Sequence, residues 1–360
     1  MAIVTFMIGN GFDLACGLKS SFRDSYDGYI KSPSSSEVIK KFKETIEKDI
    51  NTWGDFEMKL AEYAHYFSSE DEMAECVNDY KSYLVRHLTN EQEKYFQLHS
   101  EKDDIPLSQV FHFQQSLESF YSALIPNDQH SIISAMDDRN ETRYQYINFN
   151  YTTVFDRYVN RATKYASNIF KKQYIDGSII HIHGVLGQDI VLGVDNESQF
   201  SNLPYKLSKR GMRRFIKPIF LGQYDTERTN TALSFIQKSN VICTYGLSLG
   251  ESDLTWRKAL ASWLIENNKN HLVYYDYTLA SKKYPSGDIA QRMDDEEDRK
   301  EELIAFLYNS DLSAEIHDTI FEQIHVPTGK NIFNYREIVT TQIIGTITAT
   351  PPSNIAGSTL

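Results

Sequence analysis

Ala2-Ile3-Val4-Thr5-Phe6-Met7-Ile8-Gly9-Asn10-Gly11-Phe12-Asp13-Leu14-Ala15 is the stretch that decides the fold of this chain. Residues 2 to 8 are almost all apolar, with β-branched and aromatic side chains, which predicts a strand buried on both faces of a parallel sheet. Gly9 and Gly11 predict a tight turn into a helix, where a ligand can approach closely and N–H groups can meet a phosphate. Leu14 replaces the third glycine of the dehydrogenase fingerprint, so the segment predicts a nucleotide-binding turn of another kind or a turn that serves geometry alone.

Composition narrows the class of protein. A chain of 360 residues with 41% hydrophobic content can form a globular core of one or two domains. The net charge of −12 disfavours a nucleic-acid-coating protein and favours a small ligand. Three scattered cysteines predict neither disulfides nor a metal site, and no apolar run reaches the ~18 residues of a membrane span. We therefore expect a cytoplasmic protein without membrane contact.

A helical insertion follows the first helices. The loop at 31 to 36 is rich in serine, and the chain beyond it has helical periodicity at 37 to 48, 53 to 67, 70 to 97 and 108 to 124. This pattern predicts an insertion over residues 32 to 139. Glu57 lies among apolar residues of one helix face, and we interpret it as a partly exposed acid on a packing face.

Strands return after the insertion and complete a Rossmann-like parallel α/β sheet. They are predicted at 144 to 151, 178 to 183, 240 to 246 and 271 to 276, with a short strand at 190 to 194. The core would then comprise residues 1 to 31 and 140 to 280, followed by C-terminal helices over 281 to 340 and a terminal strand or tail over 341 to 360. A basic, helix-prone segment at 205 to 217 predicts either a solvated face or a surface that attracts phosphates.

Polar residues follow four of the predicted strands. They are the Gly9 turn, Asn150, His183 and the loop 246 to 253. Ligands of open α/β sheets lie beyond the carboxyl ends of the strands, so these groups are expected to share one crevice. Each has a structural alternative: Asn150 as a turn residue, His183 as a packed histidine and Asp13 as a helix cap. The pair His181 and His183 lacks further ligands with zinc spacing, so no metal is predicted.

Several motifs resemble the bacteriophage abortive infection AbiH family. In chain order they are Gly-Asn-Gly-Phe-Asp-Leu-Ala at 9 to 15, Gly-Leu-Lys-Ser-Ser-Phe at 17 to 22, Trp-Gly-Asp-Phe-Glu at 53 to 57, Asn-Phe-Asn-Tyr-Thr at 148 to 152 and His-Ile-His-Gly at 181 to 184. The resemblance runs across most of the chain. It implies defence against phage by shutting down or killing the infected cell.

The same pattern is similar to that of SIR2-like domains, which have a glycine-rich turn and strand ends with Asn and with His-Gly in the same order. This similarity implies that Asn150 positions a water or the nicotinamide ribose and that His183 acts on the ribose hydroxyls. The ligand contacts it implies are Gly9, Asn10, Gly11, Phe12, Asp13, Thr152, Gly246, Ser248 and Asp253. The chain differs from SIR2-like domains at Asn10, Asp13 and Thr152, and it has no Cys-x-x-Cys zinc ribbon.

Together these features predict a phage-defence effector that binds a nucleotide, expected to be NAD, and hydrolyses its N-glycosidic bond without a required cofactor. A nucleotide sensor without catalysis and a nuclease toxin are the alternatives. A homo-oligomer and a phage-derived trigger or partner protein remain open.

Overall fold

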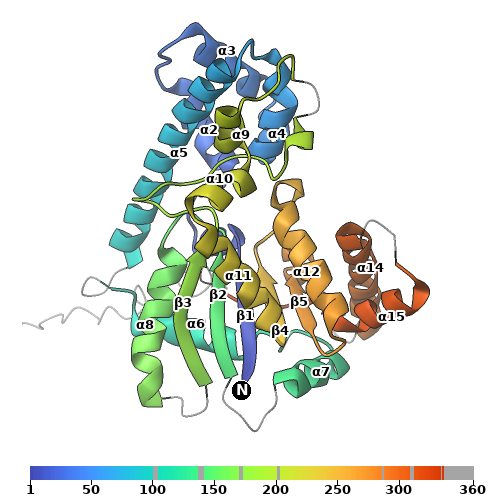
Figure 1. The fold of residues 1–360 in the computed structure, drawn as a ribbon. Helices are drawn as coiled ribbons and strands as arrows, with labels where there is room; N and C mark the ends of the chain where they lie inside the picture. The colour runs from blue at the N-terminus through green and yellow to red at the C-terminus, as the bar shows by residue number, and fades with distance from the viewer. Residues whose placement is uncertain are drawn as a thin grey trace, which may run out of the picture.

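A six-stranded parallel sheet forms the centre of the computed structural model, which describes residues 1–99, 104–136, 142–169, 173–200, 203–285, 288–308, 312–333 and 335. The strand order is β3-β2-β1-β4-β5-β6, so the N-terminal strand lies inside the sheet between β2 and β4 (Figure 1). The strands are β1 Ala2–Ile8, β2 Thr142–Asn148, β3 Gln173–His181, β4 Val241–Tyr245, β5 His271–Tyr275 and β6 Ile324–His325. This is the Rossmann-like α/β fold that the sequence predicts.

Helices cover both faces of the sheet, which explains why β1 is almost entirely apolar. Val4, Phe6 and Ile8 pack into one layer, whereas Met7 packs into the other. The first layer contains α6 Leu107–Glu118, α7 Pro126–Met136 and α8 Val154–Ile169. The second contains α11 Thr226–Lys238, α12 Leu254–Glu266, α14 Ile289–Tyr308 and α15 Ala314–Gln323. The expected C-terminal helices are therefore part of the sheet's outer layer.

A separate helical lobe stands beyond the carboxyl ends of the strands (Figure 1). It is built from α2 Phe22–Lys31, α3 Glu37–Lys48, α4 Phe56–Tyr63, α5 Glu70–His99, α9 Lys209–Phe215 and α10 Lys217–Tyr224. Its centre is aromatic: the rings of Phe56 and Tyr80 stack with centroids 4.1 Å apart, and Trp53 packs against Phe56. Two short helices, α1 Gly11–Ala15 and α13 Tyr277–Ala280, follow β1 and β5.

Side-chain caps fix where the lobe's helices begin. Ser21 and Asp24 form a reciprocal capping box at the start of α2. Asp55 accepts a hydrogen bond from the N–H of Met58 and caps α4. These caps place the first turns of α2 and α4 at the edge of the lobe that faces the sheet.

Parts of the sequence-based topology are wrong or incomplete. The strand predicted at 190 to 194 is an irregular segment in which Val194 makes only an isolated bridge to Ile216. This segment leaves the sheet for the lobe, and its N–H groups donate to the backbone of His183 and Phe215. Helix α7 and strand β6 were not predicted, and α6 and α7 of the expected insertion pack on the sheet rather than in the lobe. The predicted terminal strand or tail at 341 to 360 lies outside the described residues.

Candidate functional site

A cavity of about 280 Å³ lies between the carboxyl ends of the strands and the helical lobe. The sheet side is formed by residues that follow four strands: Gly9 after β1, Asn150 after β2, His183 after β3 and Gly246 after β4. The structure therefore brings together polar groups that are far apart in the sequence, at the edge where open α/β sheets bind ligands. We call this cavity the crevice.

The lobe supplies the opposite wall of the crevice. Ser20, Ser21 and Phe22 contribute from the start of α2, Asp55 and Glu57 from the start of α4, and Leu84 and Leu88 from α5. The residues expected at the ligand that line the crevice are Gly9, Asn10, Asp13, Asn150, Thr152, His183, Gly246, Ser248 and Asp253. Gly11 and Phe12 are not among the lining residues.

The glycine turn holds two backbone segments together. A Cβ on Gly11 would lie 2.3 Å from the Cα of Gly246, and a Cβ on Gly9 would lie 2.3 Å from the Gly246 carbonyl oxygen. The N–H groups of Gly9, Gly11 and Phe12 donate to the carbonyl oxygens of Tyr245, Gly246 and Gly9. These N–H groups are thus hydrogen-bonded to backbone carbonyls, as expected for a turn that serves geometry.

Phe12 points away from the crevice into the core. Its ring makes an edge contact with Phe155 at 5.0 Å and with Phe333 at 5.3 Å. Burial of an aromatic side chain at this position anchors α1 to the sheet. The Phe12 side chain therefore does not line the crevice.

Asp13 is a buried carboxylic acid at the base of the crevice. Its Oδ2 accepts a 2.6 Å hydrogen bond from the hydroxyl of Thr152, and no described residue provides a hydrogen-bond partner for its buried Oδ1. Burial raises the pKa of Asp13 to about 7, with a further contribution from Asp156. Near neutral pH this group can therefore exist in either protonation state and exchange a proton.

Asn150 is held by a second polar network. Its side-chain amide donates to the carbonyl oxygen of Gly9 at 3.1 Å, and its backbone carbonyl meets Nδ1 of His181 at 2.9 Å. His181 in turn contacts Asp156 at 2.7 Å, and Asp156 accepts a hydrogen bond from Asn148. Because the amide NH₂ is directed at Gly9, the amide oxygen is the atom that can orient a water. His181 thus supports the Asn150 loop and does not pack against His183.

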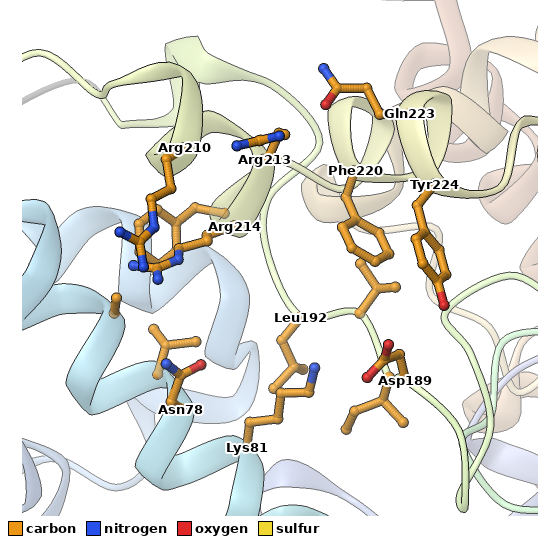
Figure 2. A pocket seen from close by; sticks show the side chains of 15 residues that line it. Asn78, Lys81, Asp189, Leu192, Arg210, Arg213, Arg214, Phe220, Gln223 and Tyr224 are labelled. Atoms are coloured by element: carbon orange, nitrogen blue, oxygen red, sulfur yellow. The ribbon is translucent and has the colours of Figure 1, made fainter.

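The basic segment divides between two environments. Arg210, Arg213 and Arg214 line a second cavity outside the crevice (Figure 2). Lys217, expected on the same basic surface, is instead buried behind the crevice. The prediction of one continuous basic surface is wrong at Lys217, because this side chain pairs with acids from other elements.

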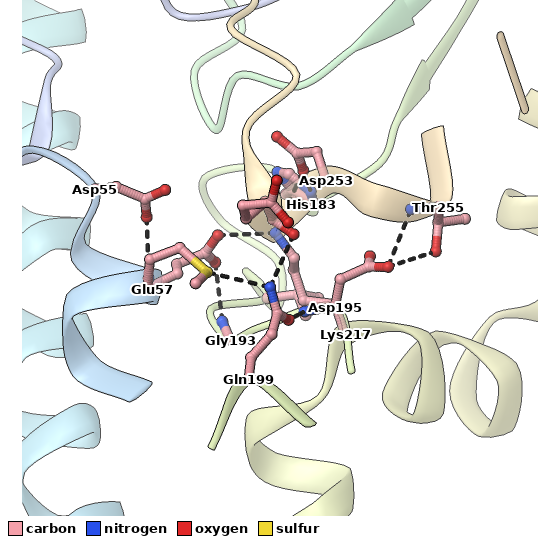
Figure 3. A network of polar contacts seen from close by, with 12 residues as sticks. Asp55, Glu57, His183, Gly193, Asp195, Gln199, Lys217, Asp253 and Thr255 are labelled. Carbon is pink, nitrogen blue, oxygen red and sulfur yellow. Dashed lines mark hydrogen bonds and ion pairs between the residues drawn. The ribbon is translucent and has the colours of Figure 1, made fainter. Parts of the chain in front are cut away.

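His183, Asp253, Lys217 and Glu57 form a buried chain of titratable groups (Figure 3). Nε2 of His183 lies 3.4 Å from Asp253, whose same oxygen lies 3.4 Å from Lys217 Nζ. Lys217 Nζ donates at 2.8 Å to Glu57, which also accepts from the N–H of Gly193. These contacts place Asp253 beside His183 at the crevice wall.

The charges within this chain are unequal. Burial alone would raise the pKa of Asp253, but Lys217 and His183 hold it well below its usual range. Burial alone would lower the pKa of Lys217, but Glu57 and Asp253 hold it above its usual range. For Glu57, burial outweighs its partners and the pKa is raised. Lys217 therefore favours the ionised form of Asp253, which faces His183.

Glu57 is the site residue that sequence reasoning assigned incorrectly. We expected a partly exposed acid on a packing face, but the residue is only 5% exposed and lines the crevice. The available signal was an acid within the apolar face of α4, since a buried acid needs a partner. That partner, Lys217, is 160 residues away in the sequence.

A cluster of potential metal ligands lies elsewhere in the fold. Within the described ranges, Asp128, Glu296 and His325 bring three ligand atoms within 4.8 Å of one another. Lys300 already contacts two of them, at 3.4 Å from Asp128 and 3.2 Å from Glu296. The cluster is formed by α7, α14 and β6 and contributes nothing to the crevice lining.

No helix in the described part of the chain combines the length and apolar character needed to cross a bilayer.

The chain matches a known protein family over most of its length. No curated protein matches the chain. The family model for bacteriophage abortive infection AbiH matches residues 5–275, which include most of β1, all of β2 to β5, the lobe and every residue that lines the crevice. The chain therefore belongs to the bacteriophage abortive infection AbiH family.

Proposed function

We propose that this protein is an abortive-infection effector that binds NAD in the crevice and hydrolyses its N-glycosidic bond. Water would replace nicotinamide at C1′ of the ribose: the C–N bond breaks, a C–O bond forms, and nicotinamide, ADP-ribose and a proton are released. The observation that carries the proposal is the acidic lining of the crevice. Asp13, Asp55, Glu57 and Asp253 line it, and none of its described lining residues is Lys or Arg.

An acid-rich crevice suits the nicotinamide half of NAD. The pyridinium ring is cationic in the substrate, and the ribose becomes oxocarbenium-like when the bond breaks. Carboxylates in a concave site of low dielectric stabilise positive charge that develops in the transition state. The same carboxylates repel phosphates, so the pyrophosphate would point out of the crevice rather than onto the glycine turn.

Asn150 and His183 take complementary roles in this reaction. The Asn150 amide oxygen would orient the attacking water, because the amide NH₂ is directed at Gly9. His183 would contact the ribose hydroxyls through Nδ1, because Nε2 faces Asp253. Asp13, with a pKa of about 7, could accept the proton that the water loses.

The test incubates the purified protein separately with NAD, NADP, ATP, RNA and DNA and identifies the products by mass. Release of nicotinamide is the expected result. Asn150→Ala and His183→Ala should keep the circular dichroism spectrum of the parent, lose about 10²-fold to 10⁴-fold in turnover and no longer arrest growth. His112→Ala, an exposed histidine on α6, is the matched control and should retain activity.

Three results would contradict the proposal. Retention of NAD without turnover would indicate a sensor, and shortened RNA or DNA would indicate a nuclease. Folded Asn150→Ala and His183→Ala proteins that still release nicotinamide would remove the assignment of these two residues.

A further inference from the structure

A second cavity, of about 540 Å³, lies on the lobe beside α5, α9 and α10 (Figure 2). Its volume falls within the range of about 300 to 1,000 Å³ that is typical of small-molecule sites. Its walls are the 74 to 81 portion of α5, the segment 189–192, the arginine face of α9 and the last turn of α10 at Phe220 to Tyr224. The cavity shares no lining residue with the crevice.

Cations dominate this cavity. Arg210, Arg213 and Arg214 stand at positions i, i+3 and i+4 of α9 and therefore project from one face of that helix. Lys81 adds a fourth cation from α5, whereas Asp189 is the single acidic residue in the described lining. The chain has a net charge of −12 and the crevice is lined by acids without Lys or Arg, whereas this cavity is lined mainly by cations.

The arginines are only partly neutralised. Arg214 lies 3.7 Å from Asp71, whose side chain is largely exposed. Among the described residues, no carboxylate lies within 4.0 Å of Arg210 or Arg213. Like charges at these spacings repel one another along the helix. An anion in the cavity would remove that repulsion, and guanidinium groups bind phosphate oxygens in pairs.

Aromatic rings form the other side of the cavity. Phe220 and Tyr224 stack with ring centroids 5.0 Å apart, on the side opposite Arg210 and Arg214 (Figure 2). Tyr224 is 63% exposed, so part of its ring is open to a planar partner. Bases stack on such rings, and stacking tolerates every base because each has a π face.

We propose that this cavity is a second ligand site, which binds a nucleoside polyphosphate with its phosphates on Arg210 and Arg213 and its base against Tyr224. The site is separate from the crevice and is independent of whether the crevice hydrolyses NAD. A mononucleotide fits better than a nucleic acid, because the cationic surface is confined to one cavity and the acidic remainder of the chain would repel a longer polyanion.

Calorimetric titration of the full chain with ATP, inorganic tripolyphosphate and adenosine tests the proposal. ATP and tripolyphosphate should bind, and adenosine should bind much more weakly. Arg210→Ala with Arg213→Ala should weaken ATP binding about 100-fold, or about tenfold for each guanidinium removed. Lys206→Ala with Lys209→Ala removes the same charge from exposed positions outside the cavity and should change affinity less than about threefold.

Two further variants locate the ligand. Tyr224→Ala should weaken ATP about tenfold while leaving tripolyphosphate unchanged, because tripolyphosphate has no base to stack on the ring. Asn150→Ala should leave ATP affinity unchanged whether or not the parent hydrolyses NAD. The proposal would be overturned if the arginine pair bound ATP as the parent does, or if the arginine and lysine pairs were weakened equally. It would also be overturned if Asn150→Ala weakened ATP binding, or if an RNA oligonucleotide bound more tightly than ATP.

Discussion

Asp13→Asn tests the electrostatics of the crevice directly. The parent carboxyl has a pKa of about 7 in the folded protein, against an ordinary value of 3.8, and burial is the main cause. Between these two values the folded state binds the proton and the unfolded state does not, so the stability of the parent falls as the pH rises. A difference of about three pKa units at ~1.36 kcal/mol each corresponds to about 4 kcal/mol in total.

The asparagine cannot ionise, and it keeps an oxygen that can accept the hydrogen bond from Thr152. Asp13→Asn should therefore gain stability relative to the parent as the pH rises, by about 2 kcal/mol between about pH 5.5 and about pH 8.5. Above that range the difference should stay constant, because the carboxyl is then ionised in both states.

The assay is urea unfolding followed by tryptophan fluorescence at both pH values. Asp27→Asn on α2 makes the same chemical change at an exposed position and should show no such pH-dependent gain. If Asp13→Asn were destabilised equally at both pH values, the buried carboxyl would be acting only as a hydrogen-bond partner and the electrostatic reasoning would be refuted.

Two other changes probe how the crevice is built. Gly246→Ala should lower the unfolding free energy by about 3 kcal/mol or more, because φ is +63° and the new Cβ would lie 2.4 Å from the Gly11 Cα. The control is Gly222→Ala, where nothing lies within 4 Å of the new Cβ, and it should be neutral or stabilising by about 0.5 to 1 kcal/mol. Thermal unfolding measures both effects. Lys217→Met should lower the unfolding free energy by about 3 to 5 kcal/mol, because it leaves buried acids unpaired. Adding Glu57→Leu should recover part of that stability in denaturant titrations. A double variant less stable than Lys217→Met would contradict the pairing.

Local patterns were sufficient to predict five of the six strands and the position of the crevice. The apolar run of β1, the glycines after it and the polar residues that follow β2 and β3 are each readable within a few residues. Parallel strands place such ends at one edge, so Asn150 and His183 could be expected in a common crevice without knowledge of their contacts.

Contacts between distant segments could not be predicted. Lys217 pairs with acids 160 and 36 residues away, and nothing around residue 217 distinguishes it from the other cations of the segment. The close approach at Gly11 is a contact of the same kind, since the group that approaches it is the backbone of Gly246. Strand β6 has two residues and is too short to show the alternation of apolar and polar side chains that predicts a strand.

The contact between the Gly9 turn and Gly246 also constrains how the family can vary. A larger side chain in most protein contacts can be accommodated by a smaller one opposite, but here the opposing groups are main-chain atoms, and no substitution makes a backbone smaller. Gly9, Gly11 and Gly246 should therefore be retained together in chains that keep this turn. We do not expect a larger residue at one of these positions to be balanced by a smaller residue at another. A related chain that lacks one of the three would have to have moved the loop after β4, and with it Ser248 and Asp253, so its crevice would have a different shape.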